Sequence, residues 1–137
     1  MLHLIKLAVG VRDIAHLAAL QKARAEASPP LRHFTRNFPK RAAELTAGGS
    51  IYWVIGGAVL ARQLILDIRH DQEPDGTPCT ALVLEPTLVR VEARAQRAFQ
   101  GWRYLEAKDA PADLTSVAGD DAMPEAMRRD LAALGLL

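Results

Sequence analysis

Residues 50–67 read S-I-Y-W-V-I-G-G-A-V-L-A-R-Q-L-I-L-D, and this stretch decides the fold class. Its first part is rich in β-branched and aromatic residues, which is typical of a strand. The pair Gly56-Gly57 fits a two-residue hairpin turn, so a second strand over residues 58–69 is expected to run back along the first. Both faces of this second strand are largely apolar, which indicates a central strand covered on both sides.

Outward from this hairpin, alternating or apolar runs predict further strands over residues 2–9, 80–84, 88–94 and 99–105. Helix-forming composition and capping residues predict helices over residues 12–27, 39–46 and 124–134, whereas residues 31–38 are expected to be irregular. The expected fold class is α+β. A mixed or antiparallel five- to six-stranded sheet curls into a small PUA-like barrel, flanked by an N-terminal helix, a short second helix and a C-terminal helix.

The chain of 137 residues fits one domain. We expect residues 1–114 to form the barrel with its helices, and residues 115–137 to form an acidic loop and a C-terminal amphipathic helix. No apolar run reaches the roughly 20 residues that a membrane-spanning helix needs, and Lys6 interrupts the apolar start that a secretory signal would require. These features predict a cytoplasmic protein that does not bind membranes. The single cysteine, Cys79, excludes a disulfide framework.

The formal net charge of +1 hides an uneven distribution of charge. Residues 1–105 hold 14 basic and 9 acidic side chains, whereas residues 106–137 hold 3 basic and 7 acidic ones. Within the basic part, cations are interleaved with aromatic residues in segments 32–41 and 90–104. Arginine beside aromatic rings is a combination that holds phosphates and stacks bases. The alternative is an ordinary solvated face beside ordinary core aromatics.

The sequence therefore predicts a binding surface for RNA or a nucleotide-like anion. Four cations would hold phosphates, three aromatic rings would stack a base, and two further arginines would orient the ligand. The candidate ligand-binding residues are Arg32, His33, Thr35, Arg36, Lys40, Arg41, Tyr52, Trp53, Arg62, Trp102 and Arg103. Arg62 lies in an apolar strand, so it is expected either to be functional or to form a buried ion pair, for instance with Glu44 or Glu85.

Motifs for catalysis are scarce. The sequence has no G-x-S-x-G nucleophile motif and no phosphate-binding loop of the Walker type. We expect no metal site and no cofactor, and no catalytic residue is assigned. Two alternatives stay open: a small enzyme that acts on an anionic substrate through His33, Thr35 and Asp67, and a structural or adaptor protein. In the latter, the C-terminal helix would dock on a protein partner or a second copy of the chain.

Residues 32–41 (R-H-F-T-R-N-F-P-K-R), 48–67 and 99–113 resemble a small bacterial family of unknown function. Its members are about 140 residues long and are common in alphaproteobacteria, and the resemblance covers nearly the whole chain without implying an activity. The predicted strand run is also similar, at the level of fold alone, to PUA and ASCH barrels, which often bind RNA or modified bases. This second resemblance implies no site residues.

Overall fold

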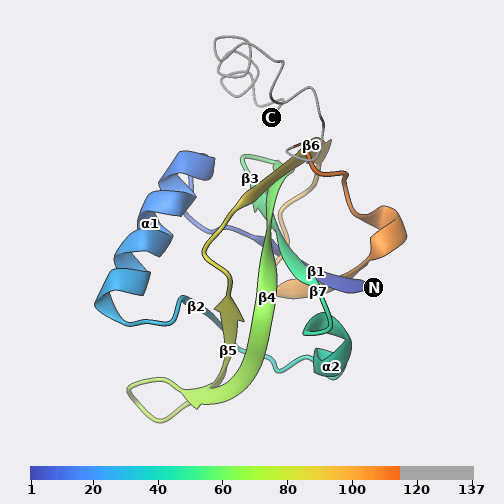
Figure 1. The fold of residues 1–137 in the computed structure, drawn as a ribbon. Helices are drawn as coiled ribbons and strands as arrows, with labels where there is room; N and C mark the ends of the chain where they lie inside the picture. Colours follow the sequence, from blue (N-terminus) through green and yellow to red (C-terminus); the bar gives the residue numbers. More distant parts are fainter. Residues whose placement is uncertain (115–137) are drawn as a thin grey trace.

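The computed structural model describes residues 1–114, in which one long strand, β4, organises the sheet (Figure 1). The elements in chain order are β1 (Leu2–Leu7), α1 (Ile14–Ala27), β2 (Arg32–Thr35), α2 (Ala42–Leu45), β3 (Ser50–Ile55), β4 (Ala58–Gln72), β5 (Pro78–Leu84), β6 (Val89–Ala95), β7 (Trp102–Glu106) and a 3-10 turn, η1 (Ala107–Asp109). None of the helices in this part of the chain is long and apolar enough to cross a membrane.

The hairpin predicted from residues 50–67 forms as β3 and β4. Gly56 and Gly57 both have positive φ angles, 60° and 85°, which suits a turn that matches the twist of the two strands. The strand order is β2-β5-β4-β3-β1-β7, and β6 pairs with the first part of β4 while β5 pairs with the second part. Because β1 runs parallel to β3 and the other pairs are antiparallel, the sheet is mixed.

The predicted fold class is wrong in three respects. The sheet has seven strands rather than five or six, it does not close into a PUA-like barrel, and the flanking by three helices is not supported. Residues 32–35, expected to be irregular, form the edge strand β2 against β5. The predicted C-terminal helix lies outside the described residues, which contain the two α-helices α1 and α2.

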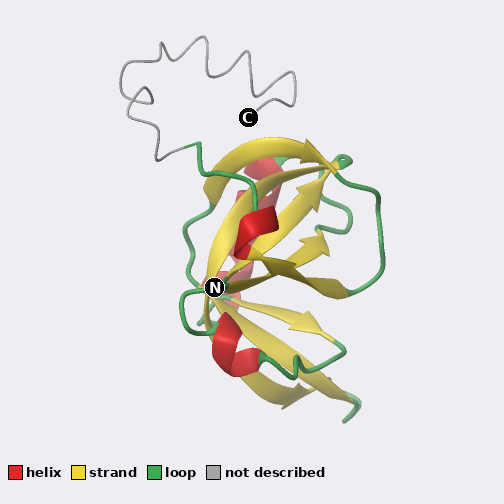
Figure 2. Ribbon diagram, turned by 90° about the vertical axis from the view of Figure 1, so that its right-hand side faces the viewer, coloured by secondary structure: helices red, strands yellow, loops and turns green. Residues whose placement is uncertain are grey.

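Two apolar clusters lie on the two faces of the sheet. The larger one includes Leu4, Trp53 and Leu84 and is covered by Leu17 of α1. The smaller one is built from Ile5, Tyr52, Val54, Val59 and Val91. Neighbouring residues of β1 and β3 alternate between the clusters, as successive side chains of a strand must. In Figure 2, α1 lies behind the sheet and η1 lies in front of it, so the two segments cover opposite faces.

Helix α1 is fixed at its start by Asp13, whose carboxylate accepts a hydrogen bond of 2.7 Å from the backbone N–H of His16. This is the capping arrangement that satisfies a free N–H in the first turn. The buried residues of α1 are Leu17 and Gln21, one turn apart on the side that faces the sheet. The next residue on this side, Arg24, is exposed at the edge of the same face. The helix therefore presents an apolar, a polar and a basic side chain in succession.

Candidate functional site

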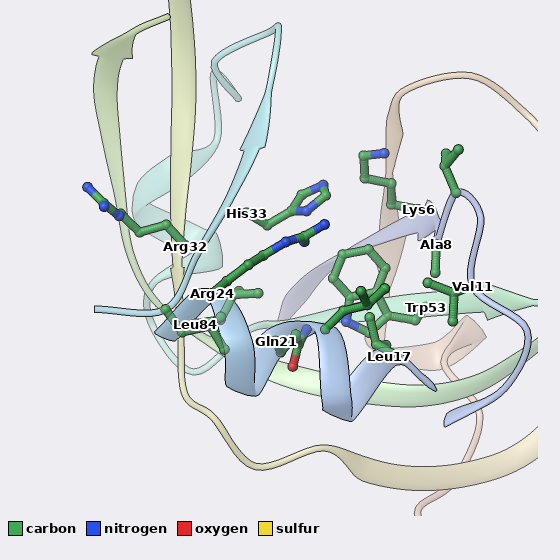
Figure 3. A pocket seen from close by; sticks show the side chains of 13 residues that line it. Lys6, Ala8, Val11, Leu17, Gln21, Arg24, Arg32, His33, Trp53 and Leu84 are labelled. Carbon is green, nitrogen blue, oxygen red and sulfur yellow. The ribbon is translucent and has the colours of Figure 1, made fainter. Parts of the chain in front are cut away.

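A cavity of about 160 Å³ lies between α1 and the sheet. Its walls come from segments that are far apart in the chain, namely β1, α1, β2, β3 and the end of β5 (Figure 3). The residues that give it its chemistry are Lys6, Gln21, Arg24, His33 and Trp53. Apolar side chains such as those of Leu17 and Leu84 complete the lining.

Positive charge collects around this cavity. Lys6, Arg24 and Arg32 line it, and among the described residues that line it there is no Asp or Glu. Figure 3 shows the guanidinium of Arg24 beside the His33 ring, whereas that of Arg32 points away from the cavity. Arg32 donates a hydrogen bond of 2.6 Å to the Ser28 hydroxyl. The cations that face the cavity are therefore Lys6 and Arg24.

Lys6 is placed by the register of the sheet. Its register partners are Trp53 on β3 and Trp102 on β7, so the lysine side chain leaves the sheet in the same row as two tryptophans, on the face that α1 covers. Burial lowers the pKa of Lys6 from its usual value of 10.5. Among residues 1–114 no carboxylate pairs with this ammonium. A desolvated ammonium gains from a bound anion, because the anion replaces the lost hydration.

A buried amide pair supports the cavity, and one of its members, Gln21, belongs to the lining. Gln21 of α1 and Gln63 of β4 donate to each other over 2.8 Å in both directions. The indole N–H of Trp53 donates to the same Gln63 oxygen at 3.1 Å. Gln63 is fully buried, so these bonds supply the partners that its amide loses from water. Gln63 is thus a satisfied core residue, and the network fixes the Trp53 ring.

His33 is the most unusual group at the site. Its ring stands edge-on to Trp53, and its Nε2 atom is buried with no hydrogen-bond partner in residues 1–114. Burial, with smaller contributions from the charges of Lys6 and Arg24, lowers the pKa of His33 to about 4. The imidazole is therefore neutral at physiological pH. A buried nitrogen without a partner points to a missing one, such as a ligand atom in the cavity.

A wider, more open recess of about 650 Å³ adjoins the cavity at the C-terminal end of α1. Three residues, Arg24, His33 and Arg32, border both spaces. The rest of the recess is lined by Ala27, Ser28, Phe34 and Pro74. The two spaces thus adjoin each other as an inner chamber and an outer recess, with these three side chains in both linings.

The remaining predicted cations lie outside this site. Arg36 and Lys40 are exposed on the connection between β2 and α2. Arg41 forms a bidentate ion pair with Glu44, at 2.6 and 2.7 Å, and lies over the Tyr104 ring. Arg103 lies over another ring, that of Phe99, with 4.4 Å between its guanidinium carbon and the ring centroid.

The three aromatic residues predicted to stack a base are separated by the fold. Tyr52 and Trp53 are 4% and 1% exposed and lie in different core clusters. Trp102 is partly buried, and its indole N–H donates to the backbone oxygen of Asn37 at 3.1 Å. Of these rings, only Trp53 lines the cavity.

Arg62 forms the ion pair that the sequence allowed, but with a different partner. Its guanidinium donates to both oxygens of Asp113, at 2.6 and 2.7 Å, and to the Ser50 hydroxyl at 3.0 Å. The suggested partners Glu44 and Glu85 are therefore wrong. A register shift on each side of Arg62 moves Leu60 and Ile68 into the larger cluster, so the apolar stripe expected around Arg62 is interrupted.

The three residues suggested for catalysis are not gathered in one place. His33 and Thr35 share a face of β2, but Thr35 borders a different pocket. Asp67 lies on β4 and pairs with Arg69 at 2.8 Å. Within residues 1–114 there is also no group of three or more His, Cys, Asp or Glu residues that could hold a metal ion.

Sequence analysis missed Lys6, Gln21 and Arg24 as site residues. Lys6 carries a usable signal, because a lysine in the middle of an apolar first strand needs a reason to be there. Gln21 and Arg24 carry a weaker signal: their spacing from Leu17 places all three residues on the same side of a helix. What the sequence does not show is that β2 brings His33 across to meet them.

Comparison with known proteins yields one match. A family model described as a protein of unknown function (DUF1489) matches residues 4–137. No curated protein and no solved structure matches the chain.

Proposed function

This chain belongs to the DUF1489 family of proteins of unknown function, and we propose that it binds a small anionic ligand in the inner chamber between α1 and the sheet. The observation that carries the proposal is the meeting of Lys6, Arg24 and a neutral His33 in one cavity whose lining contains no acidic residue in the described chain. Each of these side chains lies on a different element, so the fold itself assembles the site.

The chemistry of the chamber favours an oxyanion. Lys6 and Arg24 supply positive charge, and the fork of an arginine matches the oxygens of a phosphate or carboxylate. The neutral His33 ring can donate one hydrogen bond or accept one, depending on its tautomer. At about 160 Å³ the chamber has room for a phosphate group with some water but not for a whole drug-sized molecule.

The RNA binding predicted from the sequence needs a broader surface of cations and aromatic rings than the one that the fold assembles at the chamber. Tyr52 and Trp53 turn no ring face to solvent, and Arg41 and Arg62 are already paired with carboxylates. A small ligand needs only the chamber, so we favour it over a nucleic-acid strand. Arg36 and Lys40 remain the exposed cations through which RNA binding can be tested.

The test is calorimetric titration of the purified protein with inorganic phosphate, sulfate and acetate at low ionic strength. We expect saturable binding of phosphate with one site per chain. Lys6→Met and Arg24→Met should each weaken it at least tenfold, since each removes one charge-assisted contact. Lys40→Met is the matched control, because it removes an equally long exposed cation outside the chamber.

Two outcomes contradict the proposal. Binding that is unchanged in Lys6→Met and Arg24→Met would place the anion elsewhere. If labelled RNA binds instead, and the pair Arg36→Ala and Lys40→Ala abolishes that binding, the exposed surface carries the function and the chamber does not. Circular dichroism of each variant separates loss of binding from loss of fold.

A further inference from the structure

The outer recess carries the same sign of charge as the inner chamber. Arg24 and Arg32 line it, and no Asp or Glu of the described chain does. The turn between β4 and β5 contributes one residue to the lining, but its acids have other surroundings. Glu73 borders a different pocket, and the carboxylate of Asp75 accepts the backbone N–H of Thr77 at 2.9 Å. Within the described chain, an anion therefore meets no acidic residue in the lining of either space.

The guanidinium of Arg32 stands at the recess rather than in the chamber. It donates a hydrogen bond of 2.6 Å to the Ser28 hydroxyl, and its carbon lies 5.6 Å from the centroid of the Phe34 ring. Both of these partners line the recess. Neither is a carboxylate, and among residues 1–114 Arg32 forms no ion pair. A guanidinium has five N–H donors, so an oxyanion in the recess can accept hydrogen bonds from it.

The chamber and the recess together hold more positive charge than one phosphate group balances. Three cations line them, namely Lys6, Arg24 and Arg32. A phosphate group carries a charge of about −1.5 to −2, and the neutral His33 ring contributes no charge. Arg24 lines both spaces, and its guanidinium lies beside His33 (Figure 3), so it can contact an anion on either side. A second anionic group beside the first would complete the balance of charge.

We infer that the ligand carries a diphosphate group, with one phosphoryl group in the chamber against Lys6 and Arg24 and the other in the recess against Arg32. This inference rests on the proposed function, since it takes the chamber as the first anion site. It adds a second anion and gives Arg32 the role of recognising it. A diphosphate group occurs as the free inorganic ion or as an ester such as ADP, and the two share the chemistry that these cations recognise.

The experiment is a calorimetric series with inorganic phosphate, inorganic diphosphate and ADP at the same low ionic strength. We expect diphosphate to bind at least tenfold more tightly than phosphate, with one site per chain. Arg32→Met should weaken diphosphate at least tenfold, because it removes a charge-assisted contact, and should leave phosphate unchanged. Arg36→Met is the matched control, since Arg36 is an exposed arginine directly after β2 and lines neither space.

The outcomes separate this inference from the proposed function. If phosphate and diphosphate bind equally and Arg32→Met changes neither, the second anion site is wrong while the first one stands. If Arg36→Met weakens diphosphate as much as Arg32→Met does, general charge attraction explains the affinity and the assigned role of Arg32 is wrong. If neither phosphate nor diphosphate binds, both sites are wrong.

The ADP arm identifies the source of the diphosphate group. Affinity for ADP equal to that for inorganic diphosphate, with the same loss in Arg32→Met, supports an ester as the ligand. Tight binding of inorganic diphosphate alone supports the free ion. Circular dichroism of Arg32→Met and Arg36→Met shows whether each variant keeps its fold.

Discussion

The imidazole of His33 stands edge-on to the indole of Trp53, with ring centroids 5.0 Å apart and ring planes at 84°. Trp53 is itself held by Gln63, so the edge strand β2 is fixed to the central strands through an aromatic contact and an amide. The contact buries the His33 Nε2 atom beside two cations. The same arrangement that holds the strand also keeps the imidazole neutral, and this has a measurable consequence for stability.

Because of His33, the free energy of unfolding should decrease as the pH is lowered from neutrality to pH 5. Its pKa is about 4 in the folded protein and 6.5 when unperturbed, so the unfolded chain binds a proton in this interval that the folded chain does not. The stabilisation is complete above 6.5 and is lost as pH falls toward 4. Between pH 7.5 and pH 5 the loss amounts to about 2 kcal/mol in the free energy of unfolding.

Urea unfolding of the wild type and His33→Phe at these two pH values measures this effect. The variant keeps a ring against Trp53 but cannot titrate, so its stability should depend less on pH by that amount. Equal pH dependence in the two proteins would show that another group is responsible.

The amide pair under the chamber should behave as one unit. Gln63→Leu leaves the Gln21 amide and the Trp53 N–H buried without their partner and should cost about 2–4 kcal/mol. Gln21→Leu should cost less, because Trp53 keeps its acceptor. In urea unfolding, the double variant should be more stable than the sum of the two single effects implies. Strictly additive effects would mean that the two amides do not depend on each other.

The ion pair of Arg62 with Asp113 holds the segment after η1 against β4. Arg62→Met and Asp113→Asn should each destabilise the fold, and a double-mutant cycle at pH 7 should give a coupling of about 1–2 kcal/mol for this pair, whose side chains are 25% and 24% exposed. Arg62 lowers the pKa of Asp113 below its usual 3.8, so this stabilisation is present above pH 4 and is lost as pH falls through the lowered value. Arg62→Met should therefore flatten the acid limb of the stability curve, and an unchanged limb would contradict this account.

Gly49 is required by close packing of backbone rather than by its φ angle. A Cβ atom here would lie 2.3 Å from the carbonyl oxygen of Leu2 and 2.5 Å from that of Leu45. Neither backbone atom can move without breaking the start of β1 or the end of α2, so Gly49→Ala should cost more than about 2 kcal/mol or prevent folding. Gly76→Ala, in an open turn with a φ of 86°, should cost only about 1 kcal/mol. Thermal unfolding compares the two, and equal losses would contradict the packing argument.

The sequence predicted the elements with strong local patterns. The hairpin of β3 and β4 follows from apolar runs around Gly56-Gly57, and α1 follows from its composition and the capping Asp13. Strand β2 was missed because an exposed, basic edge strand has no apolar alternation, and its pairing with β5 spans more than forty residues of chain. Its position is decided by tertiary contact, through His33 against Trp53.

The candidate site was predictable only in part, for the same reason. His33, Arg32 and Trp53 were identified as candidates from their types, and the fold does bring them to one cavity. Lys6 and Arg24 join them from elements whose relative placement depends on the parallel pairing of β1 with β3 and on the docking of α1. The closure of a barrel was predicted from the succession of hairpin strands, but the sheet stays open, with β2 and β7 at opposite ends of the strand order.

The most direct test of the account is nuclear magnetic resonance of the His33 ring and the Trp53 indole during a titration with inorganic phosphate. The account predicts that the His33 ring nitrogens and the Trp53 N–H shift together along one binding curve, and that Lys6→Met moves both curves to at least tenfold higher phosphate concentration. It also predicts that the pKa of His33 rises above its free value of about 4 when the anion is bound, because a nearby negative charge favours the imidazolium. Shifts confined to Arg36 and Lys40, with His33 and Trp53 unmoved, would contradict it.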